Sequence, residues 1–132
     1  MKKQFKAFTL TEIMVVLVIV GILVLLALPN LQGLFGEAYA VEAKTNLKYL
    51  YERQQNFRNL EFRYTDDLNA LRFETQKTKS EGGNAVYAYE IMNADKTGFI
   101  AQATAVEDFD GDGVFNIWQI DQSGNLQEIV AD

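Results

Sequence analysis

Three aspartates in a glycine-rich stretch are the residues of this chain best suited to hold a metal ion. Asp108, Asp110 and Asp112 alternate with other residues, and a glycine follows the third. This spacing matches the front half of a D-x-D-x-D-G calcium loop, in which carboxylates converge around a glycine turn. The bidentate glutamate expected at the twelfth place is missing, because Gln119 stands there, and Asp121 or a backbone carbonyl is the candidate substitute. The alternative is a solvated turn between strands, because Asp and Gly both tolerate a positive φ angle.

The chain contains neither histidine nor cysteine. The first absence removes the commonest general base and transition-metal ligand, and the second removes disulfides and thiol nucleophiles. No pair of carboxylates is placed by the sequence in a recognisable cleft. We therefore predict that the protein is not an enzyme and has no cofactor other than the candidate Ca²⁺ ion.

Acidic residues outnumber basic ones by 18 to 12, which gives a formal net charge of −6. Three of the lysines (Lys2, Lys3 and Lys6) lie at the very start, and without them nine basic residues face 18 acidic ones. This surplus of negative charge argues against phosphate neutralisation, so no direct nucleic-acid binding is predicted.

The most hydrophobic stretch of the chain lies near its start. The run from Ile13 to Leu28 contains no charged residue. Counted from Phe8, the stretch covers 21 residues. A helix of that length rises about 30 Å, enough to cross the hydrocarbon core of a bilayer. One charge lies within this longer segment, the carboxylate of Glu12.

Glu12 has two compatible explanations. In the first, Thr9 is the N-cap of a helix and Glu12 reaches back to its backbone N–H, the arrangement called a capping box. In the second, the chain is cut between Ala7 and Phe8, which places the new α-ammonium four residues before Glu12 on the same helix face. A carboxylate at membrane depth costs about 2.5–3.5 kcal/mol and normally has a partner. We therefore expect an ion pair within the chain or with a neighbouring chain.

One long helix must carry these residues. Pro29 follows the apolar run and should bend the helix axis, but an apolar stripe with spacings of four and three resumes after it. We predict a single bent helix from about Thr9 to about Tyr64, with 8–29 as a transmembrane or filament-core half and 30–64 as an amphipathic half. The stripe comprises Ala43, Leu47, Leu50, Gln54, Phe57, Glu61 and Tyr64, with Leu60 beside it.

The remaining residues, 65–132, are predicted to form the loop and sheet of a soluble head domain. In the loop, Leu68, Leu71 and Phe73 are expected to turn inward. Four runs rich in β-branched and aromatic residues then follow, separated by short turns, which predicts an antiparallel meander. The fold class is therefore α+β, a long bent N-terminal α-helix packed on a small antiparallel four-stranded meander. The expected strands are Val86–Ile91, Gly98–Val106, Val114–Ile120 and Leu126–Val130.

The start of the chain also resembles a known processing signal. The stretch Lys6–Glu12, KAFTLTE, followed by the apolar run, is similar to the class III signal of type IV pilins and pseudopilins. The resemblance implies that prepilin peptidase removes residues 1–7 as a cytoplasmic leader by cutting between Ala7 and Phe8. It implies that Phe8 becomes a methylated N-terminus and that Glu12 is the assembly carboxylate. That family usually has glycine before the cut, where this chain has Ala7.

Further positions extend the resemblance. Gly21 and Pro29 match the pair that brackets a helix stretch able to loosen in filaments. The segments EAKTNL at 42–47 and WQIDQSG at 118–124 are also similar to type IV pilins.

The resemblance implies a structural subunit, of the major pilin kind, of a type IV pilus-like filament. Before assembly the chain would cross the inner membrane once, and afterwards it would belong to an extracellular filament at the cell surface. The implied partners are copies of the chain in a homopolymeric helical filament, prepilin peptidase, and the pilus assembly machinery of the inner membrane.

Three alternatives compete with this function. A pseudopilin of a type II secretion system ranks second, because those subunits carry proline-rich stretches and this chain has one proline. A signal-anchored extracytoplasmic calcium-binding module is the alternative from another class. A secretory signal peptide cut after Ala40 is disfavoured, because the apolar run exceeds the usual length of about 7–15 residues.

Overall fold

The computed structural model describes residues 6–132, and within 29–32 it describes the backbone but not the side chains. The chain divides into two compact units, one ending at Leu34 and the other running from Phe35 to Asp132. Helix α1 (Leu10–Glu61) is continuous through the division. Of the predicted leader, residues 1–7, the first five lie outside the described residues. The bend expected at Pro29 stays a prediction.

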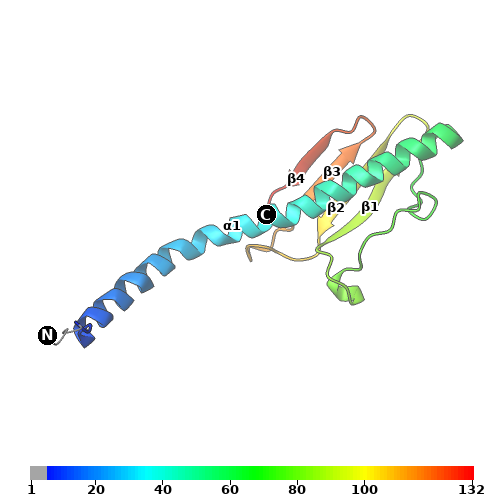
Figure 1. Ribbon diagram of the computed structural model, residues 1–132. Helices are drawn as coiled ribbons and strands as arrows, with labels where there is room; N and C mark the ends of the chain where they lie inside the picture. The colour runs from blue at the N-terminus through cyan, green and yellow to red at the C-terminus, as the bar shows by residue number, and fades with distance from the viewer. Residues whose placement is uncertain (1–5) are drawn as a thin grey trace. The chain divides into compact units, whose positions relative to one another are not determined.

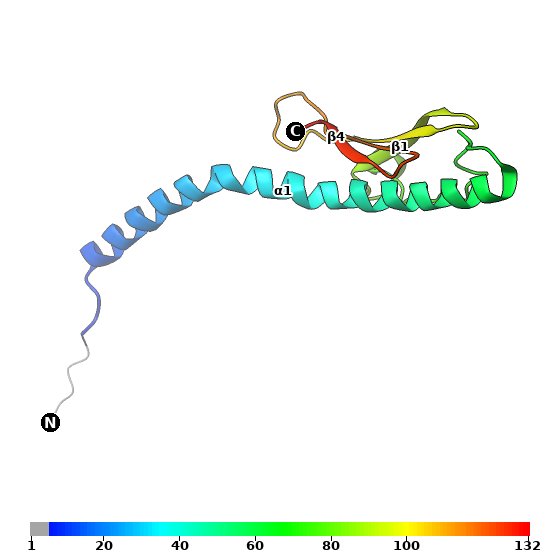
Figure 2. The same cartoon turned by 90° about the horizontal axis from the view of Figure 1, so that it is seen from above.

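The second unit consists of the C-terminal half of α1 and one antiparallel sheet (Figures 1 and 2). The strands are β1 (Tyr87–Ala94), β2 (Phe99–Ala105), β3 (Ile117–Asp121) and β4 (Leu126–Val130), and they follow one another in chain order across the sheet. The predicted α+β fold with a four-stranded meander is therefore confirmed.

The observed bounds of three strands differ from the predicted ones, and β2 is one residue shorter than expected at each end. Strand β1 extends three residues further than expected, because a bulge at Met92 lets it continue pairing as far as the Ala94–Phe99 pair. Strand β3 begins at Ile117 rather than Val114, because Val114 and Phe115 remain exposed in the preceding loop and only Asn116 is buried there. Strand β4 has its predicted bounds.

The core of this unit lies between the helix stripe and the inner face of the sheet. Helix residues Ala43, Leu47 and Leu50 are completely buried. On the sheet side, every second residue of β2 is buried, and three of these four are alanines, which allows the helix to approach closely. The buried residues of β2 are Phe99, Ala101, Ala103 and Ala105.

The stripe ends earlier than the sequence pattern predicted. Leu60 is 78% exposed and Glu61 is also exposed, whereas the stripe prediction placed both against the core. The helix stops at Glu61 because Phe62 adopts a left-handed conformation with φ 59°. Tyr64 is buried as predicted, but it reaches the core from the segment that follows the helix.

The connection from the helix to β1 is ordered by its own polar side chains. Leu71 and Phe73 are buried and Leu68 is half-buried, as predicted. A short 3₁₀ turn, η1 (Lys79–Glu81), lies where a plain loop was expected. Its capping box joins Thr78 to Glu81, because the Thr78 N–H donates to Glu81 Oε2 at 3.0 Å.

Candidate functional site

The start of α1 is built by the capping box that the sequence predicted. The backbone N–H of Thr9 donates to Glu12 Oε2 at 2.7 Å, and the N–H of Glu12 donates to Thr9 Oγ1 at 3.2 Å. Two N–H groups that the helix itself leaves unpaired are thereby satisfied. The Glu12 carboxylate therefore lies at the positive end of the helix dipole, where a negative charge is favourable.

Residues 6–9 precede the helix in an irregular, exposed segment. Ala7 and Phe8, the residues on either side of the implied cut, both lie in it, and the Phe8 side chain is 81% exposed. An exposed, non-helical peptide bond is the kind that a peptidase can reach.

The first half of α1 presents apolar side chains on all its faces. One 18-residue window has a mean hydropathy of 2.9, and no residue in it is buried. Among the large apolar residues from Ile13 to Leu28, exposure ranges from 45% at Ile13 to 69% at Leu25 and Leu26. A helix that is hydrophobic all round needs lipid or other helices to cover it. At Gly21 an added Cβ would meet no atom within 4 Å, so the glycine is not required by packing within the chain.

The acidic loop, residues 107–113, is held by its own carboxylates. Asp108 accepts the N–H groups of Gly111 and Gly113, both at 2.6 Å. Asp110 accepts the N–H of Asp112 at 3.0 Å. The loop thus has a turn stabilised by side-chain hydrogen bonds, in agreement with the second explanation offered for these aspartates.

A fourth carboxylate reaches the same place from the end of the chain. Asp108, Asp110, Asp112 and Asp132 can each offer an oxygen such that all four oxygens lie within 4.8 Å of one another. Asp132 Oδ2 accepts the N–H of Phe109 at 3.0 Å, while its Oδ1 is buried without a hydrogen-bond partner. Hard cations such as Ca²⁺ take carboxylate oxygens of this kind.

The sequence pattern did not single out Asp132, and it proposed Asp121 instead. Asp121 lies outside the cluster, because its carboxylate accepts the N–H groups of Ser123 and Asn125 in the β3–β4 turn. Gln119, at the twelfth place, donates to Gln102 on β2. The antiparallel pairing of β3 and β4 could have revealed Asp132, since it brings the end of β4 beside the start of β3, where the loop ends.

Hydrogen bonds lower the pKa of Asp108, whereas lost hydration and like charges raise the pKa of Asp110. The N–H of Gly113 holds the pKa of Asp108 below its ordinary value. The N–H of Asp112 lowers the pKa of Asp110, but lost hydration and the neighbouring charges of Asp112, Asp132 and Asp108 outweigh it, so the net pKa is raised. The cluster is therefore crowded with negative charge that a cation would relieve.

Comparison with known proteins supports a processed N-terminus. Residues 2–28 match the family model described as the prokaryotic N-terminal methylation motif. The chain is 39% identical over 89 residues to the type IV major pilin protein PilA of Myxococcus xanthus (strain DK1622). The matched part is 67% of this chain and 38% of that protein, so the chain covers less than two thirds of its relative. With its methylation motif, its exposed apolar helix and its α+β head, the chain is similar to type IV pilins.

Proposed function

We propose that this chain is a structural subunit, of the major kind, of a type IV pilus-like filament. The observation that carries the proposal is the first half of α1, whose apolar side chains are exposed on every face within a single element. Before assembly the lipid of the inner membrane would cover this surface, and in the filament the same surface would pack against the helices of other copies.

In this proposal prepilin peptidase cuts between Ala7 and Phe8, and Phe8 becomes a methylated N-terminus. The irregular segment before Leu10 supports the cut, because the peptide bond lies outside the helix and is exposed. Pilus assembly machinery in the inner membrane would then transfer the subunit into a filament at the cell surface. Mass spectrometry of the purified filament should find chains that begin at methylated Phe8; chains that begin only at Met1 would refute this step.

Glu12 is proposed to set the position of each subunit through its charge, by pairing with the α-ammonium of Phe8 on a neighbouring copy. Glu12→Gln separates this role from capping, because glutamine at the same place still completes a capping box. We expect the Gln variant to insert into membranes like the wild type and to yield at least about tenfold less filament, since an unpaired ammonium is costly in an apolar surrounding. Glu12→Ala should behave similarly, and normal yield from both variants would exclude the role.

Gly21 and Pro29 are proposed to let the intervening helix loosen during assembly. Gly21→Ala tests this cleanly, because the added methyl group meets no neighbour within 4 Å in the chain. It should favour the helix by up to about 1 kcal/mol. We expect normal membrane levels but shorter or fewer filaments, and unchanged filaments would count against loosening at this glycine.

The acidic loop supports a second candidate function, the binding of Ca²⁺. The specific observation is that Asp132 brings a fourth carboxylate, with one buried unpartnered oxygen, to Asp108, Asp110 and Asp112. Ca²⁺ at about ten times its dissociation constant should raise the unfolding free energy of the detergent-solubilised chain by about 1.4 kcal/mol. Asp132→Asn should abolish the effect and Asp121→Asn should not. No Ca²⁺-dependent shift in Tm would eliminate this function.

A further inference from the structure

The arginines of the chain are confined to one stretch of the second unit, which also contains Glu61, Asp66 and Asp67. All four arginines lie between residues 53 and 72. Residues 97–132 contain seven acidic residues and no basic one. In the unit formed by residues 35–132, the arginine-bearing end of α1 and the acidic loop lie at opposite ends (Figures 1 and 2).

The separation of these two ends can be counted along α1. Tyr39 stacks on Phe109 of the acidic loop with ring centroids 4.9 Å apart, so the loop is fixed beside the helix at that point. Phe57, near the arginine-bearing end, is 18 residues further on. At a rise of 1.5 Å per residue the two points are about 27 Å apart.

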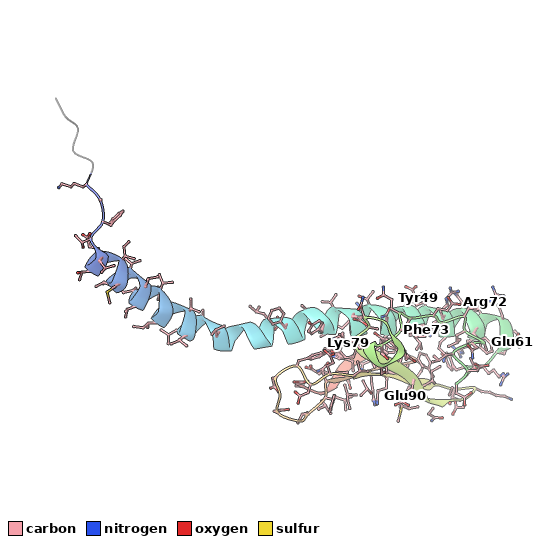
Figure 3. All side chains as sticks on the ribbon, turned by 90° about the horizontal axis from the view of Figure 1, so that it is seen from below. Tyr49, Glu61, Arg72, Phe73, Lys79 and Glu90 are labelled. Atoms are coloured by element: carbon pink, nitrogen blue, oxygen red, sulfur yellow. The ribbon has the colours of Figure 1, made fainter. Side chains whose placement is uncertain are left out.

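The arginine-bearing end contains a groove of about 390 Å³ between the last turns of α1 and the segment that follows it. Its lining includes two arginines, Arg53 and Arg72, one acidic residue, Glu61, and the exposed side chain of Leu60. Arg72 and Glu61 are both at this end of the helix in Figure 3. We call this surface the arginine groove.

Within residues 6–132, Arg53 and Arg72 form no ion pair with a carboxylate, although Glu61 lines the same groove. Across residues 6–132 the one ion pair joins Lys79 to Glu107, at a different place. The guanidinium of Arg53 donates to the Tyr49 hydroxyl, which is uncharged. Arg72 is exposed and makes no ion pair in the described part of the chain.

Backbone strain is concentrated at the same place. Among residues 6–132 only Phe62 and Arg72 combine a side chain with a positive φ, at 59° and 52°. A left-handed backbone costs a non-glycine residue about 1–2 kcal/mol. Both side chains are nevertheless large and exposed, so the strained backbone presents two bulky side chains at this surface.

The acidic loop presents the complementary surface. Asp110 and Asp112 are exposed, and directly after the loop Val114 and Phe115 are 39% and 43% exposed. This end therefore combines carboxylates with apolar side chains, as the arginine groove combines guanidinium groups with Leu60. The four-carboxylate cluster would keep a net negative charge even with one divalent cation bound.

We propose that the acidic loop of one copy of this chain docks into the arginine groove of the next copy. The inference rests on the proposed filament function and names one contact within the filament. The two surfaces differ, so the contact is head-to-tail; such contacts generate an open helical assembly when the rotation between copies does not close a ring. Asp110 and Asp112 would pair with Arg72 and Arg53, while Val114 and Phe115 cover Leu60.

Charge reversal on full-length chains, expressed in cells that carry the assembly machinery, tests this contact. Arg72→Glu and Asp110→Arg should each lower the yield of sheared surface filament at least about fivefold, because like charges then face each other at every repeat. The double variant Arg72→Glu/Asp110→Arg should recover to within about twofold of the wild type, because each pair is opposite in charge again. Asp110→Asn keeps the oxygen that accepts the Asp112 N–H and should give an intermediate loss.

Two variants serve as charge-matched controls. Lys48→Glu, on the exposed side of α1, matches Arg72→Glu, and Glu90→Arg, exposed on β1, matches Asp110→Arg. Membrane-fraction immunoblots confirm that every variant is produced. Wild-type yield from both single reversals, failure of the double variant to recover, or equal loss in the controls would overturn the docking contact while leaving the filament function intact. Absence of filament from the wild type would instead overturn the filament function.

Discussion

The side-chain amide of Gln54 makes two hydrogen bonds to the backbone of Thr65, eleven residues further along the chain. Its Nε2 donates to the Thr65 carbonyl at 2.6 Å, and its Oε1 accepts the Thr65 N–H at 3.2 Å. Gln54 is completely buried and Thr65 is 8% exposed. These two hydrogen bonds hold the chain against the core directly after α1 ends.

Replacing Gln54 should therefore destabilise the head domain strongly. Gln54→Leu keeps the volume but leaves the N–H and C=O of Thr65 buried and unpaired, which should cost about 2–4 kcal/mol. Unfolding of the detergent-solubilised chain can be followed by the fluorescence of Trp118, the only tryptophan. Gln55→Leu is the control; it removes one exposed bond of 3.3 Å and should change stability by no more than about 0.5 kcal/mol.

Two exposed apolar residues at the end of α1 should respond in opposite ways to glycine. Phe62 has φ 59°, a conformation that glycine adopts without strain, so Phe62→Gly should stabilise the chain by about 1 kcal/mol. Leu60 lies inside the helix, so Leu60→Gly should destabilise it by up to about 1 kcal/mol. Thermal unfolding by circular dichroism measures both, and equal signs for the two changes would contradict the conformational argument.

Stability should decline at alkaline pH because of two tyrosines in the core. Burial raises the pKa of Tyr87 and Tyr89 above the ordinary value of 10.0. In the unfolded chain they ionise near that ordinary value, while the folded chain keeps them neutral, so the unfolded state binds fewer protons and stability falls as pH rises. Unfolding free energies measured between about pH 9 and pH 11 should show this slope. The double variant Tyr87→Phe/Tyr89→Phe should be less stable at neutral pH but should have a flatter slope.

The side chain of Asn116 joins strands β1 and β4 at the base of the acidic loop and should not tolerate a charge. Its Oδ1 accepts the Tyr87 hydroxyl at 2.7 Å, and its Nδ2 donates to Glu128 Oε1 at 2.7 Å and to the Val130 carbonyl at 2.9 Å. Asn116→Asp replaces the donor by a carboxylate facing two acceptors, and the loss should be about 3 kcal/mol or more at neutral pH.

The penalty of Asn116→Asp should shrink as pH falls, because protonation restores a donor at this position. The matched control is Asn84→Asp, at an exposed position in the connection before β1, which should be nearly neutral. Urea titrations at two pH values measure both effects, and a pH-independent penalty would contradict the electrostatic explanation.

Much of the fold could be predicted because its patterns are periodic. The four-and-three spacing of the stripe predicted which helix face is buried, and Ala43, Leu47 and Leu50 lie in the core as expected. The capping box at Thr9 and Glu12 was predictable because both partners lie within four residues of each other. The bounds of β4 were predictable because a turn signal precedes its short apolar run.

What could not be predicted depends on tertiary contacts. The pattern extended the helix to Tyr64, but the helix stops at Glu61. Phe62 there adopts a left-handed conformation, and the side chain of Gln54 then hydrogen-bonds the backbone of Thr65. The role of Gln54 itself was hidden, since a buried glutamine in an apolar stripe has no sequence signature. Asp132 joins the acidic cluster only because β3 and β4 pair, and no spacing rule connects it to Asp108.

Among the described residues, the side-chain hydrogen bonds that start α1 join Thr9 and Glu12, and none of them involves Lys6 or Ala7. Loss of these two residues would therefore leave those bonds in place. The proposed cut between Ala7 and Phe8 would therefore change the charge at the start of α1. Three lysines would be lost, and one ammonium group would appear within reach of the Glu12 carboxylate. The precursor would be held back from polymerising by its charge and by the bulk of its extra residues, with no refolding needed to release it.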